Sequence, residues 1–160
     1  MYSRIVDTLA TAVARLEESL YPHAVILADF PRSIQLDGYS CGAKSVYAIL
    51  RYYSKRCYPL SVEQELHTTY EGTSISNIKR VIKRHGLKYR KIRNLKSAID
   101  KGYPVLVSTH GHWHYSVVYG YSKTHYFVMN PSLGEMGSLS CAVRKREFKR
   151  VRDGWALEIR

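Results

Sequence analysis

The sequence predicts an α+β fold, with helices in the first two thirds of the chain and an antiparallel sheet in the last third. Several segments before residue 100 carry apolar residues at three- and four-residue steps, which is the period of amphipathic helices. From Pro104 onward, short apolar and aromatic runs alternate with turn residues, which is typical of strands. The 160 residues contain no repeat or linker, and 45% of them are hydrophobic. We therefore expect one domain over residues 1–160.

The first helix is predicted over residues 3–20, where five apolar residues form a stripe: Ile5, Leu9, Val13, Leu16 and Leu20. We expect this helix to cover the core, with an exposed partner-binding arm as the alternative. Further helices are predicted over residues 41–53, 61–64, 77–85 and 94–100. Ser74 or Ser76 is the expected cap of the third of these, and Gly86 its stop.

Strands are predicted over residues 25–27 and 88–92, and then over 105–107, 115–121, 125–129, 139–143 and 155–159. The turn Ser122-Lys123-Thr124 joins two of them as a hairpin.

The composition is strongly basic, with 25 Lys and Arg against 13 Asp and Glu and a formal net charge of +12. Such a charge attracts nucleic acid or acidic protein surfaces, yet no base-reading motif is visible. The basic residues gather in residues 79–96 and 144–152. Two readings stay open: two solvated faces, or a surface that binds an anionic partner.

No apolar run approaches the roughly 20 residues that span a bilayer. Three cysteines, an odd number, make no disulfide framework, so we expect a reducing cytoplasm.

A candidate nucleophile opens the second predicted helix. Cys41 would lie in its first turn, where unpaired amides and the helix dipole favour a thiolate. Gly42 has no side chain, so a substrate carbonyl can approach the backbone there. Gln35, six residues earlier, offers an amide NH2 to the same carbonyl oxygen. A buried structural cysteine is the alternative.

A candidate base and its partner follow in the predicted hairpin. His114 opens the strand that runs to Tyr121, and Asn130 ends the next strand. A cysteine–histidine pair needs a third group that orients the imidazole, and the order Cys41, His114, Asn130 fits such a triad. His110, His112 and His114 could instead converge on a metal if they alternate along a strand, but we favour the rim of a binding cleft for this segment.

Together these motifs resemble the bacteriocin-processing, double-glycine-leader cysteine peptidases and their stand-alone relatives within the papain-like superfamily. Gln35 with Cys41-Gly42 matches the first family motif, and the run from His114 to Tyr121 matches the second. Asn130-Pro131-Ser132-Leu133-Gly134 matches the third, with Asn in place of the usual Asp. The likeness spans about residues 33–135. No transporter domain is attached, so cleavage of exported leader peptides does not carry over.

The resemblance implies a papain-like fold and a cysteine hydrolase, most simply a peptidase acting on a peptide or protein without a cofactor. Cys41 would be the nucleophile, His114 the base, Asn130 its orienting group and Gln35 an oxyanion donor. Tyr39, Gly42 and Trp113 would contact substrate. Two alternatives stay open: a binding module whose basic surface holds nucleic acid or an acidic protein, and an acyl transfer other than hydrolysis.

Overall fold

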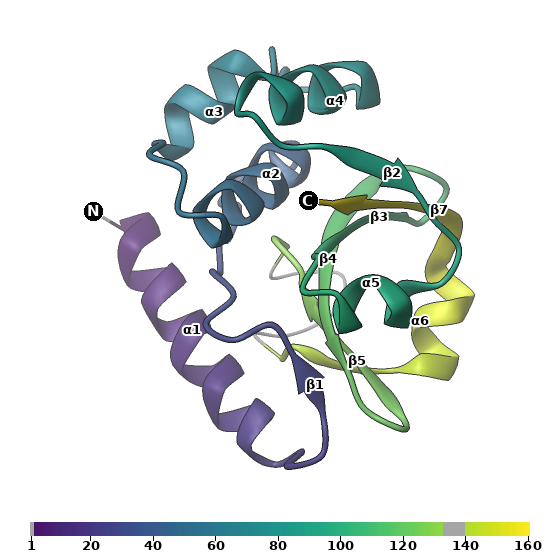
Figure 1. Ribbon diagram of the computed structural model, residues 1–160. Helices are drawn as coiled ribbons and strands as arrows, with labels where there is room; N and C mark the ends of the chain where they lie inside the picture. The colour runs from purple at the N-terminus through teal and green to yellow at the C-terminus, as the bar shows by residue number, and fades with distance from the viewer. Residues whose placement is uncertain (1, 133–139) are drawn as a thin grey trace.

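The computed structural model describes residues 2–132 and 140–160. Helices come first along the chain, and an antiparallel sheet follows, which confirms the predicted α+β class (Figure 1). The first five helices are α1 (Tyr2–Ser19), α2 (Cys41–Tyr52), α3 (Pro59–Glu65), α4 (Ile75–Arg84) and α5 (Leu95–Asp100). The helix α6 (Lys145–Val151) follows late in the chain and was not predicted.

The strands form one seven-stranded sheet in which every pairing is antiparallel. They are β1 (Val25–Ile26), β2 (Tyr89–Lys91), β3 (Val105–Thr109), β4 (His114–Tyr121), β5 (His125–Met129), β6 (Ala142–Arg144) and β7 (Arg152–Ile159). Their order is β2-β7-β3-β4-β5-β6, and β1 pairs with the far end of β4. The strand predicted from residue 139 begins at Ala142, and residue 139 lies outside the described residues.

The helix α2 packs on β4 and fixes the position of the candidate site. Its apolar face, with Val46, Ile49 and Leu50, lies in the same buried core as Val117 and Val118 of β4. At the start of both elements, the Ser45 hydroxyl donates a hydrogen bond of 3.3 Å to the backbone oxygen of Tyr115. The first turn of α2 therefore lies beside the first residues of β4.

The helix α6 covers the other face of the sheet. Successive side chains of a strand point to opposite faces. The ring of Tyr126 in β5 packs against Phe148 of α6, while the next side chain, Phe127, packs against Tyr21 and Tyr119. Figure 1 shows α2 and α6 on opposite sides of the sheet.

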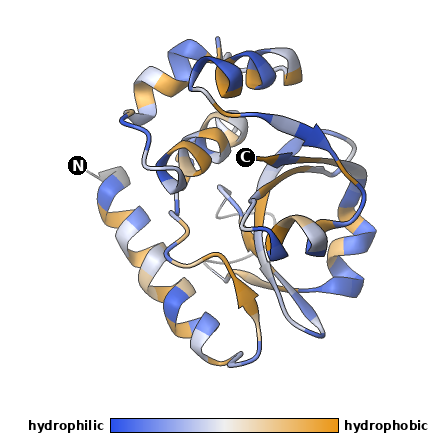
Figure 2. Cartoon of the chain, viewed as in Figure 1, coloured by the Kyte–Doolittle hydropathy of each residue, from blue (hydrophilic) through white to orange (hydrophobic). Residues whose placement is uncertain are grey.

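The helix α1 packs on the core as expected, but with a face other than its apolar stripe. Leu16 and Leu20 are 70% and 71% exposed, and the rest of the stripe is also exposed. Ala10 and Ala14 face inward instead, at 0% and 4% exposure. Figure 2 shows hydrophobic and hydrophilic bands along the whole helix, so hydropathy alone does not identify its buried side.

Polar contacts explain this orientation of α1. Asp7 accepts a hydrogen bond of 2.8 Å from the amide of Ile34, and Glu18 accepts one of 2.6 Å from the Tyr119 hydroxyl. Glu17 accepts from the amide of Cys141 at 2.6 Å. These carboxylates satisfy donors of the neighbouring segments, and the two alanines let the helix come close.

No helix in residues 2–132 and 140–160 is long and apolar enough to cross a membrane.

Candidate active site

A closed turn presents Cys41 at the first position of α2. The carboxylate of Asp37 accepts hydrogen bonds from the amides of Tyr39 and Ser40, at 2.8 and 2.7 Å, and from the Ser40 hydroxyl at 2.7 Å. The carbonyl of Ser40 then accepts the first helical bond, from Lys44 at 2.9 Å. The sequence interpretation missed Asp37, although Asp-Gly before a helix is a turn signal.

The Cys41 side chain is buried, with 7% exposure. Burial raises the pKa of its thiol above the ordinary value of 9.0, while backbone hydrogen bonds from Tyr115, Gly42 and Cys41 itself act in the opposite direction. The expected low pKa at the helix N-terminus is therefore outweighed by desolvation. The contact with the backbone of Tyr115 brings the sulfur to the residue that follows His114.

His114 and Asn130 form a buried pair across β4 and the end of β5. Each is 8% exposed, and His114 Nε2 lies 2.7 Å from Asn130 Oδ1. The amide of Ser132 donates to the same Oδ1 at 3.0 Å, which identifies this atom as the oxygen of the carboxamide. An oxygen of this kind only accepts, so Nε2 carries the proton and donates it. In the neutral ring, Nδ1 is then the basic nitrogen.

Gln35 is held beside the same segment. Its backbone amide donates to the carbonyl of Pro131 at 2.9 Å, and its side-chain Nε2 donates to the backbone carbonyl of Asp37 at 2.7 Å. The Gln35 side chain therefore lies between the Asn130-Pro131 corner and the turn before Cys41. One of its two Nε2 protons is used in this contact.

A cleft of about 190 Å³ opens over Cys41. Three segments line it: Gly38, Tyr39 and Cys41 from the turn, residues 70–73 before α4, and His112, Trp113 and Tyr115 from the sheet side. Tyr70 and Trp113 are 82% and 85% exposed, so an aromatic side chain stands on each wall. His114, Asn130 and Gln35 do not line this cleft. The sequence interpretation missed residues 70–73, which nothing marks beyond a Glu-Gly turn.

The space beside Gly42 is filled by the protein itself. A Cβ atom on Gly42 would lie 2.9 Å from Thr73 Cβ and 3.2 Å from the Tyr115 ring. Glycine is thus required here for α2 to pack between the 70–73 segment and β4.

The loop between β3 and β4 is held by Asp153 of β7. The amides of Gly111 and His112 donate to its two carboxylate oxygens at 2.8 and 2.7 Å. His110, Gly111 and His112 all have positive φ angles, of 56°, 71° and 70°. Non-glycine residues rarely adopt this conformation, and Asp153 stabilises it. The clamp sets the path of the chain immediately before Trp113 and His114.

This loop removes the strand alternation on which a three-histidine metal site would depend. His112 Nδ1 lies 3.0 Å from Ser108 Oγ, and His110 Nδ1 lies 3.0 Å from Thr109 Oγ1. In the part of the chain that the structure describes, no group of three His, Cys, Asp or Glu residues is placed to hold a metal ion.

Comparison with known proteins gives one family match. The model of the peptidase C39 family matches residues 29–159. Among curated proteins, none matches the chain in sequence.

Several solved structures of peptidases are also similar to this chain. A double glycine motif protease from an AMS/PCAT transporter, solved with its leader peptide, is 22% identical with a TM-score of 0.70, covering 82% of this chain and 91% of its own. The peptidase domain of Streptococcus ComA is 20% identical with a TM-score of 0.64, covering 79% and 94%. A C39-like peptidase from Bacillus anthracis is 15% identical with a TM-score of 0.68, covering 86% and 97%. Identities this low establish a shared fold alone.

Proposed function

Because the chain belongs to the peptidase C39 family of cysteine peptidases, we propose that it cleaves an amide bond of a peptide or protein with Cys41, His114 and Asn130. The observation that supports this most is the buried His114–Asn130 pair, 2.7 Å apart. It directs the basic Nδ1 of the ring away from Asn130, and the next residue along β4 contacts the Cys41 thiol.

In this mechanism, His114 Nδ1 takes the thiol proton and the Cys41 thiolate attacks the carbonyl carbon. The second Nε2 proton of Gln35 and the amide of Cys41 stabilise the oxyanion, and losing one such donor costs about 3 kcal/mol in characterised enzymes. Collapse of the intermediate breaks the C–N bond, and the imidazolium protonates the leaving amine. Water, deprotonated by His114, then hydrolyses the thioester and releases Cys41.

The walls of the cleft suggest how substrate is held. Tyr39 and Trp113 line it and would contact the chain on either side of the cleaved bond. Gly42 does not line the cleft and Thr73 fills the space at its Cβ position, so it could meet substrate only through its backbone. A peptide ligand fits this arrangement, and the transporter protease cited above was solved with one. All three cysteines are free thiols, so we place the protein in a reducing cytoplasm.

Alkylation by iodoacetamide between pH 5 and pH 10 tests the thiol–imidazole pair. The wild type should react at Cys41 already near neutral pH, because a neighbouring imidazolium stabilises the thiolate. In His114→Ala no imidazolium opposes the effect of burial, which raises the pKa of Cys41 and keeps it as the thiol, so the rate should rise only above about pH 9. Burial raises the pKa of Cys141 to about 12 and also raises that of Cys57, so both should stay slow.

Equal alkylation rates at Cys41 and Cys57 in the wild type would contradict the thiol–imidazole pair and favour a module that only binds. An unchanged pH profile of Cys41 alkylation in His114→Ala would do the same.

Mass spectrometry of peptides incubated with the wild type and with Cys41→Ala then tests the reaction itself. Free carboxylate products indicate hydrolysis, whereas products joined to an added amine indicate acyl transfer.

A further inference from the structure

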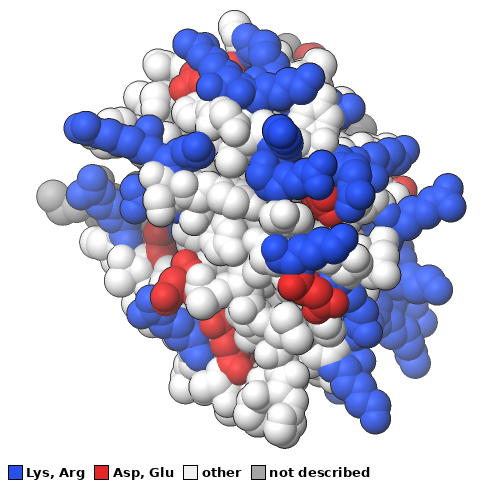
Figure 3. Space-filling model, viewed as in Figure 1, with Lys and Arg blue, Asp and Glu red and all other residues white. Residues whose placement is uncertain are grey.

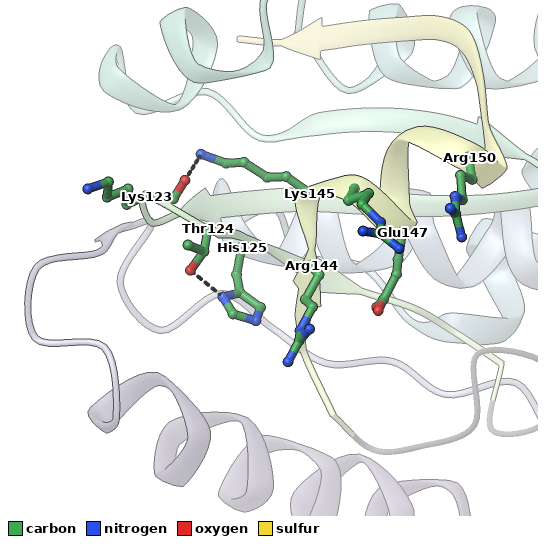
Figure 4. A pocket seen from close by; sticks show the side chains of 8 residues that line it. Lys123, Thr124, His125, Arg144, Lys145, Glu147 and Arg150 are labelled. Atoms are coloured by element: carbon green, nitrogen blue, oxygen red, sulfur yellow. Dashed lines mark hydrogen bonds between the residues drawn. The ribbon is translucent and has the colours of Figure 1, made fainter.

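The second basic group of the sequence surrounds two cavities along α6, on the face of the sheet opposite α2. The first, of about 560 Å³, is lined by five cations together with Thr124, His125 and Glu147 (Figure 4): Lys123, Arg144, Lys145, Arg146 and Arg150. The second, of about 440 Å³, shares Lys145 and adds Arg93, Lys149 and Arg152. We call these eight cations the basic track. Figure 3 shows Lys and Arg side chains gathered over α4, β2 and α6.

The charges of the track are not balanced within the described residues. None of the eight cations forms an ion pair with a described carboxylate. Lys145 instead donates to the carbonyls of Ser122 and Lys123, and its ammonium lies over the rings of Tyr121 and Tyr126. Figure 4 shows Lys145 reaching toward Lys123, while the side chains of Arg144 and Arg150 point in other directions. Like charges held together in this way attract an anionic ligand.

The track runs along α6 from the far end of the sheet toward the loop between β3 and β4, which borders the cleft. It begins at the β4–β5 hairpin, where the amide of Lys145 donates to the carbonyl of Thr124 at 2.9 Å. This hairpin lies at the opposite end of β4 from His114, roughly 25 Å away for an eight-residue strand. At the other end of α6, the carbonyl of Val151 accepts from the amide of His110 at 2.9 Å. Arg152 then pairs with Thr109, and Asp153 holds the loop that carries Trp113.

We propose that the basic track binds an acidic segment of the polypeptide substrate while a distant part of the same polypeptide enters the Cys41 cleft. This rests on the proposed function for the cleft, but the docking is a separate property of α6. Extended polypeptide covers about 3.3 Å per residue, so some eight residues would span the length of β4.

Two observations favour a polypeptide over a nucleic acid. The carboxylate of Glu147 stands among the cations, where it would repel a continuous phosphate backbone but leaves room for acidic side chains spaced along a peptide. The second cavity also has aromatic walls, formed by Tyr126 and Phe148, which suit the apolar side chains between acidic ones.

Binding is measured with Cys41→Ala, so that no probe is cleaved, by fluorescence anisotropy of a labelled deca-glutamate peptide at low and high salt. We expect salt-sensitive binding that weakens about tenfold or more in Arg146→Glu/Arg150→Glu. Arg4→Glu/Lys83→Glu, with one position on α1 and one on α4 away from the track, is the control with the same change in net charge, and it should bind as the parent does. Arg146→Gln/Arg150→Gln replaces the double variant if reversal prevents folding.

The absence of deca-glutamate binding would overturn the proposal. Equal weakening in Arg4→Glu/Lys83→Glu would also overturn it, because it would mean attraction by net charge alone. A labelled deca-thymidylate probe would assign the track to nucleic acid instead if it bound more tightly than deca-glutamate and if this binding were lost in the same double variant. Cys41 alkylation is measured separately in the double variant with intact Cys41. The alkylation rate should be the same as in the wild type. The two measurements are independent: lack of deca-glutamate binding would not contradict the proposed chemistry, and an unreactive Cys41 would not contradict binding to the track.

Discussion

At the scale of single residues, the orientation of one ring nitrogen depends on one carboxamide. Asn130 Oδ1 accepts hydrogen bonds from both His114 Nε2 and the backbone amide of Ser132. The bond from Ser132 holds the carboxamide in place, and the carboxamide in turn orients the imidazole. The carboxylate usual in the family would accept the same two bonds and add a charge. Asparagine therefore preserves the tautomer of His114 while giving less stabilisation to the imidazolium.

We predict that Asn130→Ala lowers kcat by roughly tenfold to 100-fold with little change in KM, because Nε2 loses its acceptor and the ring loses its tautomer preference. Steady-state cleavage of a peptide substrate measures this. Asn130→Asp is the matched control and should retain activity, since both carboxylate oxygens accept. Full activity in Asn130→Ala would remove Asn130 from the proposed site.

At the scale of elements, α1 shows how far hydrophobic periodicity can mislead. Its large apolar side chains face solvent, and its small ones face the protein. The inward face carries Asp7, Ala10, Ala14 and Glu17, which repeat at helical spacing like the apolar stripe does. Both faces therefore repeat at helical spacing, and only the segments that pack against the helix decide which face is buried.

This orientation predicts that a mutation on the alanine face of α1 destabilises the protein more than one on the leucine stripe. Leu16→Gln should change the free energy of unfolding by no more than about 0.5 kcal/mol, because the side chain is already 70% exposed. Ala14→Gln should destabilise the protein by about 1–3 kcal/mol, because it forces a larger polar group into a closed contact. Urea unfolding of both variants measures the difference. The opposite order would mean that α1 packs through its leucine stripe.

The elements that could be predicted are those with a local signature. Ser74, one of the two expected caps, begins α4, and both the short helix predicted near residues 94–100 and the β4–β5 hairpin lie where the sequence predicts them. The candidate site could be anticipated as three separate motifs, because a cysteine at a helix start and a histidine at a strand start are local features. Asp153 could not, since its contacts with residues 111 and 112 cross about forty positions of chain. The helix α6 is too short and too charged to show an apolar period.

At the scale of the whole molecule, the sheet is completed by the strand that comes last in the chain. β7 lies between β2 and β3 and forms backbone ladders with both. It also supplies Asp153 to the loop beside the cleft and Arg152 to the basic track. One element thus contributes to the core, the site and the proposed docking surface.

We predict that deletion of residues 152–160 abolishes cooperative thermal unfolding, because it leaves β2 and β3 without a common neighbour and exposes the core around Leu157. Circular dichroism during heating measures this. Deletion of Arg160 alone is the control. It removes the backbone pair with Lys88 and the ion pair between Arg160 and Glu158, and it should keep a sigmoidal transition at a somewhat lower temperature. A cooperative transition in the longer deletion would show that the remaining strands close the sheet themselves.

The central place of β7 also has a consequence during synthesis. A ribosome releases Cys41 and its helix early, yet the sheet on which His114 is positioned cannot close until the residues of β7 have left the exit tunnel. A chain that lacks β7 therefore carries the proposed nucleophile without a positioned imidazole, so the proposed activity should arise only once β7 has joined the sheet.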